Sequence, residues 1–331
     1  MASNGPTRRD VLKSGGALAG VAVLGGLSGC LDSIPFLGGD SALGNVPEDS
    51  EGAVYLSLDT VREDDATQAV ADAYLANSYY EPNDFDGLLD QFEDQTDLDP
   101  EGAHELTGFA EYNDSGGTSD YGGAILRTDW AEDDLVDALE DSGPDLDEGE
   151  EAGKTVYEPE EDYGSWMGVI EEGTFVVGSE DAVVGSIELS AGEGEQMDQA
   201  LRDAYSSTRD APVRFVSVVP TDQFDDELGY GDNTVDLSAV DDIEHASGSI
   251  YQDGDVRGLS VTLTVDDGDA AGDLADTIEE VIEFYQDAVS EDSDIHSELD
   301  EIEVSEESSA ATVTYEKDVD EIEDLVEEYA G

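Results

Sequence analysis

One run of strict two-residue alternation constrains the fold of this chain more than any other feature. From Leu259 to Val265, apolar Leu and Val alternate with Ser and Thr, which gives a β-strand one apolar and one polar face. The segment from His245 to Tyr251 precedes it, and the two are predicted to form a hairpin. An amphipathic helix is predicted next, with apolar residues at helical spacing: Leu274, Ile278, Val281, Ile282, Tyr285 and Val289.

Strands in hairpins and helices alternate along the rest of the chain. The sequence predicts strands at 53–58, 106–112, 121–128, 154–157, 165–171, 174–178, 213–219, 302–304 and 312–315, and a loop at 142–153. Helices are predicted after Asp64, around Phe85, around Leu135, and at 179–189, 197–205 and 319–329. Hairpins with interspersed helices indicate an α+β fold, in which amphipathic helices pack on one side of an antiparallel sheet.

Two units of this kind are predicted, with the boundary near Arg209–Pro212. The first covers residues 50–209 and the second covers 210–331. The strand at 124–129, which leads into a helix at Leu135, resembles the strand at 261–267, which leads into a helix at Leu274. Two modules of one type would explain this repeat. Chance is the alternative, because strand–turn–helix is a common order.

The chain carries 87 Asp and Glu against 11 Lys and Arg, a formal charge of -76. In dilute buffer such a charge repels itself and opposes compaction. In molar salt the Debye length falls to about 3 Å, so neighbouring carboxylates scarcely interact. The composition therefore indicates a protein adapted to high salt. Intrinsic disorder is the competing interpretation, but the 38% of hydrophobic residues, set in clear strand and helix periods, favours a folded body.

The first 29 residues have the layout of an export signal rather than of a folded element. Arg8 and Arg9 precede a glycine-rich apolar segment that is too short and too interrupted to be a stable membrane span. Cys30 follows, and residues 30–49 are rich in Gly and lack a period, which predicts a flexible tether. The alternatives are a chance arginine pair on a cytosolic protein and an uncleaved membrane anchor.

Two motifs in this leader resemble known signals. Thr7–Lys13 is similar to a twin-arginine export motif, with Val11 where Phe is usual, and Leu27–Cys30 resembles a lipobox. Together with the acidic composition, they resemble exported lipoproteins of haloarchaea. The resemblance implies export of the folded chain through Arg8 and Arg9, lipid attachment at Cys30, and a location on the extracellular face of the cell membrane. Its implied partners are the membrane and the twin-arginine machinery.

The body also resembles a group of uncharacterised cell-envelope proteins. The resemblance rests on Val46-Pro47 before the first strand and on Phe175–Ser179 before a helix, and it spans roughly residues 46–251. This group has no established activity, so the resemblance implies an architecture only.

Several kinds of site are disfavoured by the sequence. The arginines of the body stand singly, so a phosphate-binding surface for nucleic acid is not predicted. Ser165 and Ser179 lack the glycines of a nucleophile elbow, and no dinucleotide or phosphate loop is present. His104, His245 and His296 lie far apart, which argues against an imidazole metal site. We therefore expect no catalytic residues, no cofactor and no metal.

Calcium is the open alternative, because three acidic fragments imitate parts of calcium loops: 97–102, 84–87 and 266–269. The functional prediction is a lipid-anchored, non-enzymatic surface protein with a structural or interaction role. The alternative is a solute-binding lipoprotein that delivers a small ligand to a transporter. An exported hydrolase is the third hypothesis, and it would need a Ser, His and acid cluster.

Overall fold

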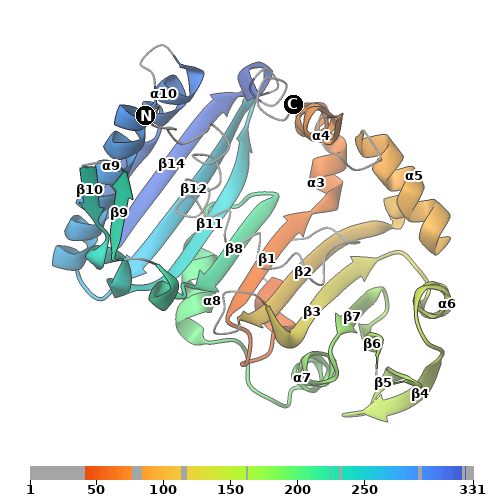
Figure 1. Cartoon of the computed structure of the whole chain (residues 1–331). Coiled ribbons are helices and arrows are strands. Elements are labelled where there is room, and N and C mark those ends of the chain that lie inside the picture. The colour runs from red at the N-terminus through yellow and green to blue at the C-terminus, as the bar shows by residue number, and fades with distance from the viewer. Residues whose placement is uncertain are drawn as a thin grey trace, which may run out of the picture.

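One twelve-stranded antiparallel sheet organises the chain (Figure 1). The computed structural model describes residues 42–76, 84–112, 118–161, 163–224, 226–230, 233–289, 293–322 and 325. Together with its helices, this sheet confirms the predicted α+β class. The strand order is β13-β14-β12-β11-β8-β1-β2-β3-β7-β6-β5-β4.

The strands of this sheet are β1 (Gly52–Ser57), β2 (Ala103–Tyr112), β3 (Thr118–Thr128), β4 (Leu146–Glu151), β5 (Lys154–Pro159), β6 (Trp166–Glu171), β7 (Thr174–Gly178), β8 (Val213–Val218), β11 (Ile243–Asp253), β12 (Val256–Val265), β13 (Glu303–Glu307) and β14 (Ala310–Asp318). A separate ribbon pairs β9 (Glu227–Tyr230) with β10 (Asn233–Asp236).

The α-helices are α3 (Leu58–Glu63), α4 (Asp65–Ala76), α5 (Phe85–Thr96), α6 (Glu132–Ser142), α7 (Glu180–Ser190), α8 (Gln199–Ser207), α9 (Gly268–Ala288) and α10 (Asp294–Leu299). Short 3-10 helices are η1 (Ala42–Asn45), η2 (Pro100–Gly102), η3 (Thr221–Gln223) and η4 (Ser238–Asp242).

The strands of residues 50–209 and those of residues 210–331 form two contiguous halves of this one sheet. Their boundary at 209–212 lies directly before β8, and β8 pairs with β1 from Gly52↔Ser217 to Leu56↔Val213. Outward from this seam, the first half runs β1-β2-β3-β7-β6-β5-β4 and the second runs β8-β11-β12-β14-β13. Because β1 and β8 are antiparallel and the first five strands of each half follow the same order, these strands are related by a pseudo-twofold axis near the Val54↔Phe215 pair.

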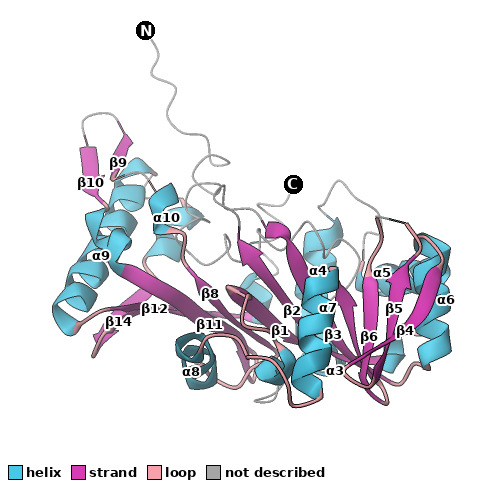
Figure 2. Ribbon diagram, turned by 90° about the horizontal axis from the view of Figure 1, so that it is seen from below, coloured by secondary structure: helices cyan, strands magenta, loops and turns pink. Residues whose placement is uncertain are grey.

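Helices lie on both faces of the sheet, so their packing is not confined to the one side expected from the sequence. On one face α7 and α8 cover a core that contains Phe109, Val176 and Val216. On the other face α6 packs near Leu126 and Phe175, and α9 packs near Val265. Figure 2 shows α9 and α10 on the side of the sheet opposite α8. Consecutive apolar residues explain this, since Ile125-Leu126 and Phe175-Val176 point to alternate faces and bury both.

The predicted loop at 142–153 is wrong, because residues 146–151 form the edge strand β4. This strand has one neighbour, β5, and its residues are exposed or half-buried. An edge strand that buries neither face needs no apolar alternation, and its acidic side chains keep the open edge soluble. Its sequence therefore carries no strand period.

Candidate functional site

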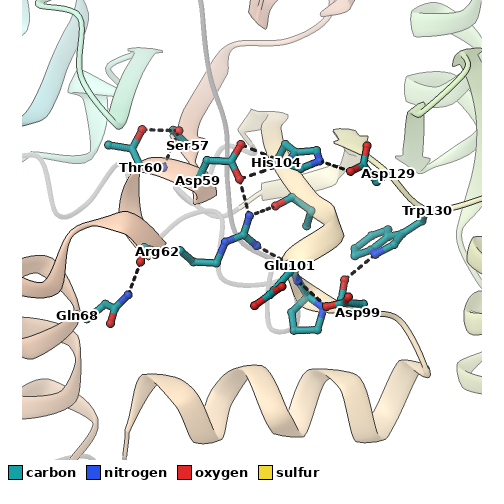
Figure 3. A network of polar contacts seen from close by, with 12 residues as sticks. Ser57, Asp59, Thr60, Arg62, Gln68, Asp99, Glu101, His104, Asp129 and Trp130 are labelled. Carbon is teal, nitrogen blue, oxygen red and sulfur yellow. Dashed lines mark hydrogen bonds and ion pairs between the residues drawn. The ribbon is translucent and has the colours of Figure 1, made fainter.

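Three charged side chains converge where β1 and β3 end and β2 begins (Figure 3). Both outer strands are antiparallel to β2, so their final residues lie beside its first. Asp59 follows β1, Asp129 follows β3, and His104 is the second residue of β2. His104 Nδ1 lies 3.1 Å from both carboxylate oxygens of Asp59, and its Nε2 lies 3.1 Å from Asp129 Oδ2.

This geometry favours the imidazolium form of His104. Ionised carboxylates only accept hydrogen bonds, so both ring nitrogens must carry a proton to satisfy them. The hydrogen bond to Asp59 raises the pKa of His104, burial opposes this, and Asp129 raises it further. Burial alone would raise the pKa of Asp59, but hydrogen bonds from His104 and Arg62 lower it below its ordinary value. Both the geometry and the direction of these shifts therefore favour a charged bridge of imidazolium and carboxylates.

Arg62 extends the bridge to the start of β2. Its guanidinium donates to Asp59 Oδ1 at 2.5 Å, to Ala103 O at 2.7 Å, and to Pro100 O. The carbonyl of Arg62 in turn accepts from Gln68 Nε2 at 2.6 Å. Beside them Trp130 Nε1 donates to Asp99 O at 2.7 Å. Five elements, α3, α4, η2, β2 and the turn after β3, are joined by these bonds.

The arrangement is poorly suited to proton transfer to a substrate. A general base needs a ring nitrogen with a free lone pair, and both nitrogens of His104 face carboxylates. Ser57, the nearby hydroxyl at the end of β1, caps α3 by accepting from Thr60 N and shares a hydrogen bond with Thr60 Oγ1. The geometry supports a role in holding α3 in place.

A second ionic cluster joins the two halves of the sheet. Arg257 of β12 donates to both oxygens of Asp64, at 2.6 and 2.5 Å, and Gln252 of β11 donates to Asp64 Oδ2 at 3.0 Å. Asp64 also accepts from Thr67 N at 2.8 Å, so it caps α4 while it binds the other half. Burial alone would raise the pKa of Asp64, but hydrogen bonds from Thr67 and Arg257 lower it.

All eight Lys and Arg residues after Cys30 have partners within the body. Four arginines pair with carboxylates: Arg62 with Asp59, Arg127 with Glu105, Arg209 with Asp253, and Arg257 with Asp64. Lys317 lies within 4 Å of Glu298, Glu301 and Glu321. Arg202, Arg214 and Lys154 donate to backbone carbonyls of Met197, Tyr205 and Ile170.

Arg214 is the most buried of these cations. Its residue is 2% exposed, it donates to Tyr205 O at 2.8 Å and Thr208 Oγ1 at 2.9 Å, and its guanidinium lies 4.2 Å from the Tyr205 ring centre. These partners are at the C-terminal end of α8, where a cation complements the helix dipole. Arg214 therefore fixes α8 on the sheet.

The calcium-like fragments cap helices. Asp84 accepts from Gly87 N, Asp99 from Glu101 N, and Asp267 from Asp269 N and Ala270 N. Each carboxylate thus satisfies amide groups of a first helical turn. Among the described residues, no group of three or more His, Asp or Glu is arranged to hold a metal ion.

The residues predicted as sites have different outcomes. Arg8, Arg9 and Cys30 lie outside the described residues, so their roles stay predictions. His245 is buried on β11, and burial lowers its pKa. His296 lies on α10, 3.6 Å from Asp300. Sequence reasoning missed the bridge of His104. Its one signal was an acid within two residues of the end of each strand that flanks β2, the strand with an early histidine.

Comparisons with known proteins add little. No family model matches the chain, and no curated protein matches it. Among solved structures, TP0453 is similar at 8% identity in crystal form I (TM-score 0.44, 87% of this chain and 96% of that chain). Form III has a TM-score of 0.47 at 8% identity (90% and 99%), and form IV has 0.42 at 9% identity (91% and 99%). These TM-scores are too low to bear on function.

Proposed function

We propose that this protein is a lipid-anchored, non-enzymatic surface protein of the extracellular face of the membrane, adapted to concentrated salt, with a structural or interaction role. One observation carries the proposal. All eight Lys and Arg residues after Cys30 have partners within the body of the protein, so they stabilise the fold. The surface is left with a large excess of carboxylates, which molar salt screens. Such a surface offers little to nucleic acid or other polyanions.

The anchoring part of the proposal rests on Arg8, Arg9 and Cys30. It is tested in the native host by replacing Cys30 with Ser and, separately, both arginines with Lys. Cys30→Ser should release the protein from the membrane fraction and abolish incorporation of a labelled lipid precursor. The double Lys variant should accumulate inside the cell. As a matched control, Arg127→Lys, a like change at an exposed ion pair, should leave both properties unchanged. Unaltered location of the double Lys variant would refute twin-arginine export.

The salt part of the proposal is tested by circular dichroism on residues 31–331. Secondary structure should be complete in 3 M KCl and largely lost in 0.1 M KCl, because the Debye length then grows to about 10 Å and neighbouring carboxylates repel. Equal structure in both buffers would contradict salt adaptation.

In the described residues, no helix is both long enough and apolar enough to cross a membrane.

Delivery of a small solute to a transporter is the second candidate, and it is kept because exported lipoproteins often have this role. A thermal-shift screen in 3 M KCl against sugars, amino acids, peptides and anions separates the two. A ligand that binds only the folded protein raises the melting temperature as its concentration passes Kd. One chemical class of hits would favour solute binding, and a flat screen would favour the structural or interaction role.

A further inference from the structure

The bridge at His104 links α3 directly to the turn between β3 and α6. Asp59 belongs to α3, which opens the excursion between β1 and β2, and Asp129 belongs to the turn before α6. His104 touches both carboxylates at 3.1 Å. Its side chain is 30% exposed, against 50% for Asp59 and 82% for Asp129, so protons reach the site from solvent.

The charges around His104 come close to balance only when it is protonated. The ring contacts Asp59 after β1 and Asp129 after β3. Asp59 also binds Arg62 of α3, and Glu105 of the same strand as His104 binds Arg127 of β3. Farther acids are Asp99 and Glu101 near η2 and the first turn of α6, Glu132, Asp133 and Asp134. Near the ring, three carboxylates then meet two guanidinium groups and one imidazolium. Loss of the proton leaves an unbalanced carboxylate in a partly buried cluster, which is unfavourable.

We propose that His104 is a pH-operated latch: protonated, it ties α3 to the turn between β3 and α6, and deprotonated, it releases α3 from that turn. A neutral imidazole has one N–H, so it can donate to Asp59 or to Asp129 but not to both. The other ring nitrogen then presents a lone pair to a carboxylate and repels it. Arg62 keeps its bonds to Pro100 O and Ala103 O, so the release is local.

The direction of the pH dependence follows from the raised pKa of His104. A histidine whose pKa is higher in the closed state stabilises that state fully below the pKa of the open state, about 6.5. The contribution is lost as pH rises through the higher pKa of the closed state. The latch is thus closed in acid and opens toward alkaline pH. The neighbouring helix α4 is held differently, by the bonds of Asp64 to Thr67 and Arg257, and these bonds lower the pKa of Asp64.

The latch is tested by amide hydrogen exchange on residues 31–331 in 3 M KCl from pH 5.5 to 9, with each rate divided by that of the unfolded peptide at the same pH. The protection of α3 amides against exchange should fall as pH rises. The fall should be about tenfold for each unit by which the pKa of His104 in the closed state exceeds its pKa in the open state. Protection of α9, which is remote from the site, should stay constant. In His104→Gln, α3 should have low protection at every pH.

A second variant keeps the test decisive where His104→Gln folds poorly. Asp129→Asn removes the charge beside Nε2 and leaves His104 and Asp59 in place, so the midpoint of the α3 transition should move to lower pH. NMR titration of His104, with His245 and His296 as internal references, should give the same midpoint as exchange. Protection of α3 that does not change with pH in the wild type, or a transition that persists in His104→Gln, would overturn the proposal.

Discussion

The ion pair between Arg257 and Asp64 should be worth far more to stability than an exposed pair, and Arg257→Met tests this. The side chains of Arg257 and Asp64 are 9% and 22% exposed, and their closest atoms are 2.5 Å apart. Loss of one partner from a buried pair costs about 3–5 kcal/mol. Asp64 here regains some hydration and keeps the Thr67 and Gln252 hydrogen bonds, so we expect a loss of about 2–3 kcal/mol in unfolding free energy.

The matched control is Arg127→Met, because Arg127 and its partner Glu105 are 49% and 30% exposed. An exposed pair of this kind contributes at most about 1 kcal/mol. Urea unfolding in 3 M KCl measures both variants, since urea leaves the ionic strength constant. The Arg257 pair is largely buried, and salt screens buried pairs much less than exposed ones, so its loss should still be large in 3 M KCl. A smaller loss for Arg257→Met than for Arg127→Met would refute the reasoning.

Three further perturbations follow from the structure. Gly248→Ala should lower the free energy of urea unfolding by about 3 kcal/mol, because the new Cβ would lie 2.4 Å from Ser260 O and 2.5 Å from the Phe215 ring. Gly44→Ala is the control and should be near neutral, because nothing lies within 4 Å of its Cβ position. Lys317→Met should lower stability by about 2 kcal/mol and speed hydrogen exchange in α10, since Lys317 holds Glu298 and Glu301 of that region at 3.1 and 2.5 Å. Arg214→Met should speed exchange in the last turn of α8 while α7 stays protected, because Arg214 donates to Tyr205 and Thr208.

The hairpins and helices of this fold could be predicted because their burial leaves a period in the sequence. β12 alternates from Leu259 to Val265, and α9 has a continuous apolar stripe. The class of fold follows from those periods. β4 could not be predicted, since an edge strand with exposed faces places no demand on its residue pattern. The continuity of the sheet from β1 to β8 could not be predicted either, because a strand pair far apart in sequence leaves no local signal.

The bridge at His104 illustrates the same limit. Asp59, His104 and Asp129 each look unremarkable among so many carboxylates. They are brought together because β1 and β3 both flank β2 and are antiparallel to it. That order brings an acid within two residues of the end of each outer strand close to a histidine at the start of the middle strand. The information is thus in the sheet topology, which local periods do not encode.

The repeat that the sequence suggests falls at equivalent places in the two halves. Ala124 and Val261 lie on the same face, through the register pairs Ala124↔Gly108↔Val54↔Phe215↔Gly248↔Val261. Ala124 lies on β3, which β1 and β2 separate from the pseudo-twofold axis, and Val261 lies on β12, which β8 and β11 separate from it. β3 leads into α6, and β12 leads into α9. Gly108 and Gly248 are also equivalent, next to the seam pair Val54↔Phe215.

The first half carries two extra outer strands, β5 and β4, and the halves also differ in what connects their first two strands. Helices α3, α4 and α5 lie between β1 and β2, whereas η3, the β9–β10 ribbon and η4 lie between β8 and β11. Asp59, Arg62 and Asp64 all belong to the first connection, and His104 follows it directly. A shared strand order therefore supplies the rigid frame. Asp59 and Asp64, the carboxylates that contact His104 and Arg257, lie on the helical insertion between β1 and β2 that distinguishes the first half. Connections vary at little cost to the core, so this insertion is where the specific properties of the protein are best sought.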